Sequence, residues 1–174
     1  MKNRTLRQIT AAGVIAAAYA ALSLVLASTT FGPVQCRVSE ALTLLPVLSP
    51  AAVWGVTLGC AITNGVGAAT GTNFLGLVDL PVGTAATLLA AVATRLLGKI
   101  RFGGLPWLSA LPPILFNAVA IGGEWCYAMT GSINGAFWVF AGQIALGQLP
   151  PCLLGVWLVG LLERRSLQTI IEGK

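Results

Sequence analysis

The stretch Gln35-Cys36-Arg37-Val38-Ser39-Glu40-Ala41-Leu42-Thr43-Leu44-Leu45-Pro46 places a basic and an acidic side chain inside a chain that is otherwise strongly apolar. On a helix, the three-residue spacing puts Arg37 and Glu40 on the same face. Ionisable groups are costly in or beside hydrocarbon, so such a pair is expected to face the protein interior or a water-filled cavity. We therefore take Arg37 and Glu40 as the centre of a candidate binding site.

The composition places the chain among membrane proteins. Of its residues 56% are hydrophobic and 9% are charged, and its mean hydropathy is +0.87. A soluble domain of this length would be far less apolar. The basic residues give a net charge of +5, but they form short clusters rather than one exposed stripe, so we expect no nucleic-acid partner. The predicted fold class is an all-α integral membrane protein, with residues 1–174 as a single domain.

Apolar runs, separated by Gly, Pro and polar residues, divide the chain into six expected transmembrane helices. They cover residues 9–29, 38–48, 51–69, 79–98, 109–129 and 136–162. The first run follows basic residues, as a signal-peptide core does, but about 20 apolar residues span a bilayer and exceed such a core. The second run is too short for a straight span, so we expect a short helix that its neighbours protect.

The basic clusters also predict the topology. They lie at residues 2–7, 95–101 and 164–165, and all fall on one side of the membrane if six helices leave both termini in the cytoplasm. Polar side chains then gather near the outer ends of the helices, where we predict a pocket capped by residues 70–78. The candidate substrate-binding residues are Arg37, Glu40, Asn64, Asp79, Asn117, Glu124, Trp125 and Gln148.

Several of these residues also allow a structural interpretation. Asp79 stands at the start of an expected helix and fits an N-cap. Glu124 fits a structural ion pair or a ligand contact, and the ligand contact is favoured because an unpaired carboxylate in a membrane helix is costly. Trp125, Tyr127 and Trp138 share the outer level, where aromatic rings either stack on a ligand or form the belt at the lipid interface.

The sequence lacks the residues of a catalytic or metal site. It has no histidine, no Walker-type glycine loop, no Ser or Cys beside an evident base, and four widely spaced cysteines that we expect to be packing residues. We therefore predict no enzyme activity, no cofactor and no metal. Any uphill transport would need an ion gradient or a partner ATPase. The carboxylates and amides suit a flat polar heterocycle, because a carboxylate can accept two N–H bonds from an amidine-like edge.

The first expected helix carries two ladders of small residues at four-residue spacing. Such ladders let another helix approach closely, either within the same bundle or from a partner subunit. The ladders are Ala12, Ala16 and Ala20, and Gly13, Ala17 and Ala21.

Longer blocks of sequence point to a family. The blocks are Arg37-Val38-Ser39-Glu40-Ala41-Leu42-Thr43-Leu44-Leu45-Pro46, the helix around Asn64, Asn73-Phe74-Leu75-Gly76, Asp79 with Gly83–Leu89, and Pro112–Asn117. Together they cover most of the chain and resemble the queuosine-precursor transporter family (QueT type). The resemblance implies a substrate-binding S component of an energy-coupling factor (ECF) transporter in a bacterial cell membrane. Such subunits associate with a transmembrane scaffold subunit and two cytoplasmic ATPases.

The resemblance also implies a substrate and a docking surface. The substrate would be a 7-deazaguanine base, either queuine or one of its biosynthetic precursors. Glu40 or Glu124 would accept hydrogen bonds from the guanine-like edge, the other carboxylate would meet a substrate amine, and Arg37 would contact the substrate or hold Glu40. The small-residue ladders resemble the alanine-rich motif through which S components dock on the scaffold subunit.

Two interpretations of other classes stay open at this point. A stand-alone secondary transporter would use Glu40, Asp79 and Glu124 to relay protons or cations. A small membrane enzyme would use two carboxyl groups for acid–base chemistry. An S component needs an ATPase module for uptake, and a secondary transporter does not. Binding of substrate by the purified protein distinguishes an S component from a membrane enzyme.

Overall fold

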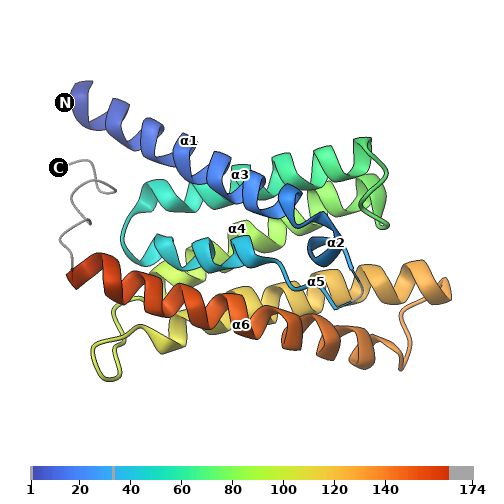
Figure 1. Cartoon of the computed structure of the whole chain (residues 1–174). Helices are drawn as coiled ribbons and strands as arrows, with labels where there is room; N and C mark the ends of the chain where they lie inside the picture. Colours follow the sequence, from blue (N-terminus) through green and yellow to red (C-terminus); the bar gives the residue numbers. More distant parts are fainter. Residues whose placement is uncertain (1, 33, 165–174) are drawn as a thin grey trace.

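The computed structural model describes residues 2–32 and 34–164, so two basic residues, Arg165 of the cluster at 164–165 and Lys174, lie outside the described part. The chain folds into a bundle of helices (Figure 1). No strand occurs among the described residues, and an isolated bridge joins Phe102 to Leu105. The helices are α1 (Lys2–Val25), α2 (Ala27–Thr30), η1 (Val38–Val47), α3 (Pro50–Ala69), η2 (Gly76–Val78), α4 (Asp79–Leu97), η3 (Trp107–Ala110), α5 (Leu111–Thr130) and α6 (Phe137–Arg164).

Each of the six apolar segments predicted from the sequence corresponds to a helix. Within the described residues, four helical segments are long and apolar enough to cross a membrane: Asn3–Val25, Pro50–Ala69, Gly76–Leu97 and Phe137–Arg164. Helix α5 also has 20 residues but is not among these four segments, and η1 has only ten residues. The chain is therefore an all-helical, multi-pass membrane protein. Six spans and the cytoplasmic position of both termini stay predictions.

Helix η1 occupies the middle of the bundle. It packs against α1, α3, α4 and α6. Ten residues make a long run for a 3-10 helix, because its hydrogen-bond geometry is less favourable than that of an α-helix. Six of the ten side chains are buried, and Leu44 packs with Val56 of α3 and Val156 of α6 in the main hydrophobic cluster. The stretch that carries Arg37 and Glu40 thus lies inside the molecule, as a protected short helix must.

Glycines on α3 set the distance between α3 and α1. A Cβ atom at Gly55 would lie 2.8 Å from the Ile15 Cβ atom, and one at Gly59 would lie 2.7 Å from the Tyr19 Cβ atom. Real Cβ atoms do not approach other atoms so closely, so only glycine allows this crossing. The close approach brings Tyr19 of α1 to the centre of the bundle, where its side chain is completely buried.

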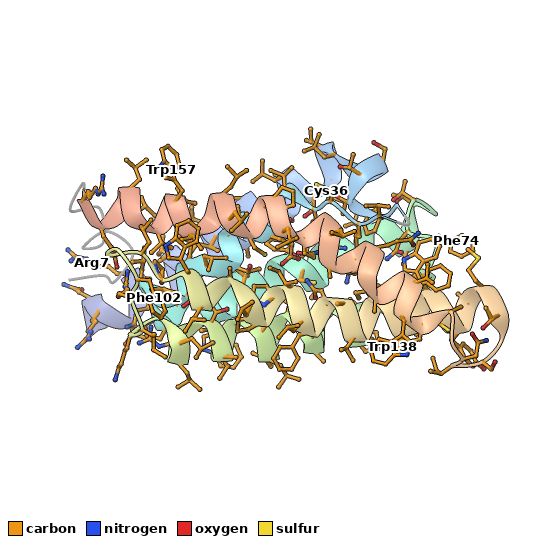
Figure 2. All side chains as sticks on the ribbon, turned by 90° about the horizontal axis from the view of Figure 1, so that it is seen from below. Arg7, Cys36, Phe74, Phe102, Trp138 and Trp157 are labelled. Atoms are coloured by element: carbon orange, nitrogen blue, oxygen red, sulfur yellow. The ribbon has the colours of Figure 1, made fainter. Side chains whose placement is uncertain are left out.

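Apart from the buried Arg37, the described basic residues gather at one end of the bundle. The start of α1, the end of α6 and the loop of residues 98–106 share that end (Figure 1). Arg101 in the loop donates hydrogen bonds of 2.9 and 2.8 Å to Glu163 of α6. Figure 2 shows Arg7 and Phe102 at this end and Phe74 at the opposite end. The basic clusters thus share one end of the bundle, as the predicted topology requires. The loops of residues 70–78 and 131–136 lie at the opposite end.

Candidate ligand-binding site

Arg37 is held by side chains from two helices that precede and follow it in the chain. It is the N-cap residue of η1, with extended backbone angles, and its side chain is buried. Its guanidinium group donates to the Asn64 Oδ1 atom at 3.2 Å, the Tyr19 hydroxyl at 3.5 Å and the Cys60 Sγ atom at 3.7 Å. The Phe31 ring lies 5.6 Å from the guanidinium carbon. Neutral groups and an aromatic face therefore surround the buried positive charge.

Glu40 connects to Arg37 through a third residue. The Tyr19 hydroxyl donates a 2.5 Å hydrogen bond to the Glu40 Oε1 atom and accepts one from Arg37. Across the described residues, the ion pair within 4 Å is that of Arg101 with Glu163, so Arg37 does not hold Glu40 by a direct ion pair. The Asn117 side chain lies close enough to the Glu40 carboxylate to interact with it. Tyr19 thus fixes the Oε1 atom of Glu40, and Asn117 is the other side chain that interacts with this carboxylate.

Asp79 is not an N-cap, so that interpretation is wrong. The N-cap of α4 is Val78, which makes no side-chain capping bond, and Asp79 is the first residue of the helix. Its Oδ2 atom accepts a 2.8 Å hydrogen bond from the Asn73 amide, and its backbone oxygen accepts one from Asn64 at 3.0 Å. A Cβ atom at Gly83 would collide with the Asp79 Oδ1 atom. Asp79 is completely buried and is positioned by the 70–78 loop.

Glu124 of α5 faces the Asp79 carboxyl group and interacts with it electrostatically. No basic residue of the described chain forms an ion pair with Glu124, so the structural ion pair considered from the sequence is wrong. Glu124 lines a cavity of about 300 Å³ together with Leu75 and Val78. Two carboxyl groups therefore meet beside an open cavity at the end of the bundle that carries the 70–78 loop.

Aromatic rings form a wall at the same level. Trp125 is buried, and its ring stacks on Phe74 at 5.1 Å and on Phe140 at 6.4 Å between ring centroids. Tyr127 and Trp138 are 63% and 76% exposed, and Figure 2 shows Trp138 on the outside of the bundle. Of the three aromatic residues considered from the sequence, Trp125 lies inside, while the other two lie where an interfacial belt would be.

The strongest indication of a ligand site is the set of buried polar atoms that have no hydrogen-bond partner among the described residues. Native proteins leave few such atoms unpaired. Within the predicted set they are Arg37 Nε, Glu40 Oε2, Asp79 Oδ1, both Glu124 carboxylate oxygens, Trp125 Nε1 and both amide atoms of Gln148. Gln148 follows Gly147, whose backbone packs directly on that of Gln35, so the α6 amide lies near the start of η1. Three more such atoms occur at Thr84, Ser109 and Gln143.

The two small-residue ladders of α1 face in different directions. Ala16 and Ala20 are buried, and Ala16 borders Gly59 of α3, so this ladder packs within the bundle. Ala12 is half-buried on the same face, whereas the second ladder of Gly13, Ala17 and Ala21 is exposed. Docking of a partner helix therefore stays a prediction for the exposed ladder.

Sequence reasoning missed Tyr19, Cys60 and Asn73 as parts of this site. Each of these three residues makes its main contact with a residue of another helix or loop. A hydropathy pattern does not show which residues of different helices are in contact. Tyr19 had one usable signal, because it lies between Ala16 and Ala20 on a buried face and brings a hydroxyl group that needs a partner there. Cys60 was expected to be a packing residue, yet its sulfur accepts from Arg37 and Asn64.

A comparison with protein families now identifies the chain's relatives. A family model described as QueT transporter matches residues 9–164. The chain belongs to the QueT transporter family. The match covers every helix that builds the site, from α1 to α6, and confirms the family resemblance inferred from the Arg37–Pro46 stretch. Searches of curated proteins and of solved structures found no match to this QueT-family chain. Membership of a transporter family favours transport over catalysis.

Proposed function

We propose that the chain is the substrate-binding S component of an ECF transporter in a bacterial cell membrane and forms one domain over residues 1–174. It captures queuine or a related 7-deazaguanine base from outside for ATP-driven uptake. The observation that carries this proposal is the buried, incompletely paired polar set around Arg37, Glu40, Asp79 and Glu124. These groups lie in a QueT-family chain away from its basic end, so they suit a polar ligand that enters from the outer side.

The chemistry of the set matches a guanine-like ring. Carboxylate oxygens accept N–H bonds, the Gln148 amide can both donate and accept, and the Arg37 Nε atom can donate to a ring carbonyl. The buried indole of Trp125 offers an N–H donor, while its ring stacks on Phe74 and Phe140. A planar heterocycle with several donors and acceptors satisfies more of these atoms than an inorganic ion or an aliphatic solute would.

The exposed ladder of α1 supports the partner part of the proposal. Helix α1 packs mainly on α3 and η1, which leaves the face of Gly13, Ala17 and Ala21 open. A transmembrane scaffold subunit can pack closely on such a face, while two ATPases supply the energy from the cytoplasmic side.

Calorimetric binding to the purified protein without partner subunits tests the proposal. The ligands are queuine, its two free-base precursors and guanine. We expect a dissociation constant in the nanomolar to micromolar range, about −12 to −8 kcal/mol, for at least one deazaguanine and weaker binding of guanine. Absence of binding to every deazaguanine would contradict the proposal. Uptake in cells that continues without a co-expressed ATPase module would favour the secondary transporter.

A further inference from the structure

A second cavity lies at the basic end of the bundle, away from the candidate ligand-binding site. Its volume is about 570 Å³, which falls in the range of about 300–1,000 Å³ that is usual for ligand pockets. The cavity lies where η1 ends and where α4 leads into the loop of residues 98–106. Its lining consists of Val47, Arg95, Leu96, Gly98, Lys99 and Arg101. The predicted substrate-binding set includes none of these residues, so the cavity needs its own explanation.

The positive charges of this cavity are only partly compensated. Arg101 is paired with Glu163, whose two carboxylate oxygens accept its hydrogen bonds. Arg95 and Lys99 form no ion pair with any residue that the structure describes. Two uncompensated cations therefore face the same cavity. Arginine and lysine are the side chains that bind phosphate groups in proteins, so the cavity favours a phosphate-bearing anion.

Contacts with the backbone hold the arginine side chains in place. The Arg95 Nη1 atom donates a 3.0 Å hydrogen bond to the Pro46 oxygen near the end of η1, and its other N–H groups have no partner among the described residues. The Arg101 Nε atom donates to the Gly98 oxygen at 2.8 Å. A Cβ atom at Gly98 would lie 3.0 Å from the Val47 Cγ1 atom, so glycine allows η1 and α4 to approach closely here. The Arg95 cation is thus anchored while it keeps donors for a ligand.

The surroundings of the cavity favour a phospholipid headgroup over a free anion. Leu96 in the lining is 72% exposed, and Phe102 in the following loop is 57% exposed. The segment Gly76–Leu97 is one of the four that are long and apolar enough to cross a membrane, so its end lies where hydrocarbon meets the headgroups. Apolar side chains beside free cations match a lipid, which presents a phosphate and acyl chains together. Basic pockets between transmembrane helices bind anionic headgroups in this way.

We propose that this cavity binds the headgroup of an anionic phospholipid, with Arg95 and Lys99 on the phosphate and Leu96 beside an acyl chain. Because Arg95 also holds the Pro46 oxygen, the bound lipid contacts the end of η1, the helix that carries Glu40. Lipid binding therefore stabilises the folded chain as well as its place in the membrane. The proposal does not depend on which substrate the chain carries or on its partner subunits.

Titration of the purified full chain in detergent with phosphatidylglycerol and with phosphatidylcholine tests the lipid site. Native mass spectrometry measures the bound lipid, and thermal unfolding measures the stabilisation. We expect phosphatidylglycerol to bind about tenfold or more tightly than phosphatidylcholine and to raise the melting temperature more. Arg95→Gln combined with Lys99→Gln should weaken phosphatidylglycerol binding by about 10- to 30-fold, since each cation contributes about fivefold. Lys99→Gln alone should weaken it by about fivefold, and it serves if the double variant does not fold.

A matched double variant controls for diffuse attraction. Arg4→Gln combined with Arg7→Gln removes the same charge from the start of α1, outside the cavity, and should weaken phosphatidylglycerol binding by less than about threefold. Equal weakening by the two double variants, or equal affinity of the wild type for both lipids, would overturn the lipid site. Inorganic phosphate that binds as tightly as phosphatidylglycerol would assign the cavity to a free anion. Tighter binding of hexaglutamate would assign it to an acidic protein segment, and either result would also overturn the proposal.

Discussion

Tyr19 is the residue that joins the first helix to the polar centre. Its hydroxyl group lies between the Arg37 guanidinium and the Glu40 carboxylate and bonds to both. A completely buried carboxylate that is not paired directly with a cation depends on such donors, because hydrogen bonds to charged groups contribute about 1.5–3 kcal/mol each. We therefore expect Tyr19 to be a positioning residue, which would set the Glu40 oxygen that a ligand meets.

The change Tyr19→Phe tests this role. The ring keeps its packing, while the donor to Glu40 is lost and the carboxylate can rotate. We expect ligand affinity to fall by about tenfold, equivalent to about 1.4 kcal/mol, and thermal stability to fall as well because a buried charge loses a partner. Calorimetric binding and thermal unfolding in detergent measure the two effects. Thr10→Val, which removes an exposed hydroxyl group from the same helix α1, is the control. A lower melting temperature with unchanged affinity would limit Tyr19 to a structural role.

Arg37 and Glu40 illustrate what the sequence reveals at the residue scale. Their placement inside the bundle was predictable, because charges in an apolar chain must be buried together. The connection between them was not, since it depends on Tyr19, a residue of another helix. Asp79 shows the same limit: its position at a helix start suggested a cap, but the partner that decides its role is Asn73 in the preceding loop.

The close crossing of α1 and α3 places the candidate site in the interior of the bundle. Gly55 and Gly59 let the two helices touch, and this contact carries Tyr19 to the centre while α3 contributes Asn64 from one turn further along. The positions of the helices follow from apolar runs and prolines, so the sequence predicted the bounds of the five later helices within about two residues. Helix α1 begins at Lys2, earlier than the predicted residue 9, because its first turns are polar. The 3-10 form of η1 and the side of α1 that faces inward depend on packing, which hydropathy does not encode.

The change Gly59→Ala probes the crossing. A methyl group at this position would lie 2.7 Å from the Tyr19 Cβ atom and 3.0 Å from the Ala16 oxygen, so α1 must move away. Overpacking of this kind costs about 1–3 kcal/mol. We expect a lower melting temperature together with weaker ligand binding, because Tyr19 moves with the helix. The change Gly142→Ala on α6 meets open space and should have little effect on either measurement. If Gly59→Ala kept the wild-type ligand affinity, the crossing of α1 and α3 would have no role in positioning the site.

The outward ladder of α1 makes a separate prediction. The change Ala17→Leu places a large side chain on an exposed surface, so binding and stability of the isolated chain should be retained. Co-purification with the scaffold subunit should decrease strongly, since a bulky residue prevents close helix contact. Ala16→Leu is the contrasting variant, because it enlarges a buried residue and should destabilise the chain itself. Undiminished co-purification of Ala17→Leu would place the docking surface elsewhere.

At the scale of the whole molecule, charge and polarity are separated along the bundle. The described basic residues outside the site occupy one end, while the free carboxylate oxygens lie towards the other end, beneath the loop of residues 70–78. This separation would serve an importer subunit: the basic end is retained in the cytoplasm, and the polar cavity receives substrate from outside. The basic clusters allowed the sequence to predict this polarity, because insertion depends on charges near the helix ends and not on tertiary contacts.

Thiol labelling in whole cells tests that orientation. Gly135→Cys lies in the loop between α5 and α6, and Phe102→Cys lies in the loop between α4 and η3, at opposite ends of the bundle. Both are made in a Cys36→Ser background, since the other three native cysteines are buried. A membrane-impermeant maleimide should label Gly135→Cys in intact cells and Phe102→Cys only after permeabilisation. The reverse pattern would invert the protein and turn the carboxylates towards the cytoplasm, where they could not receive an imported base.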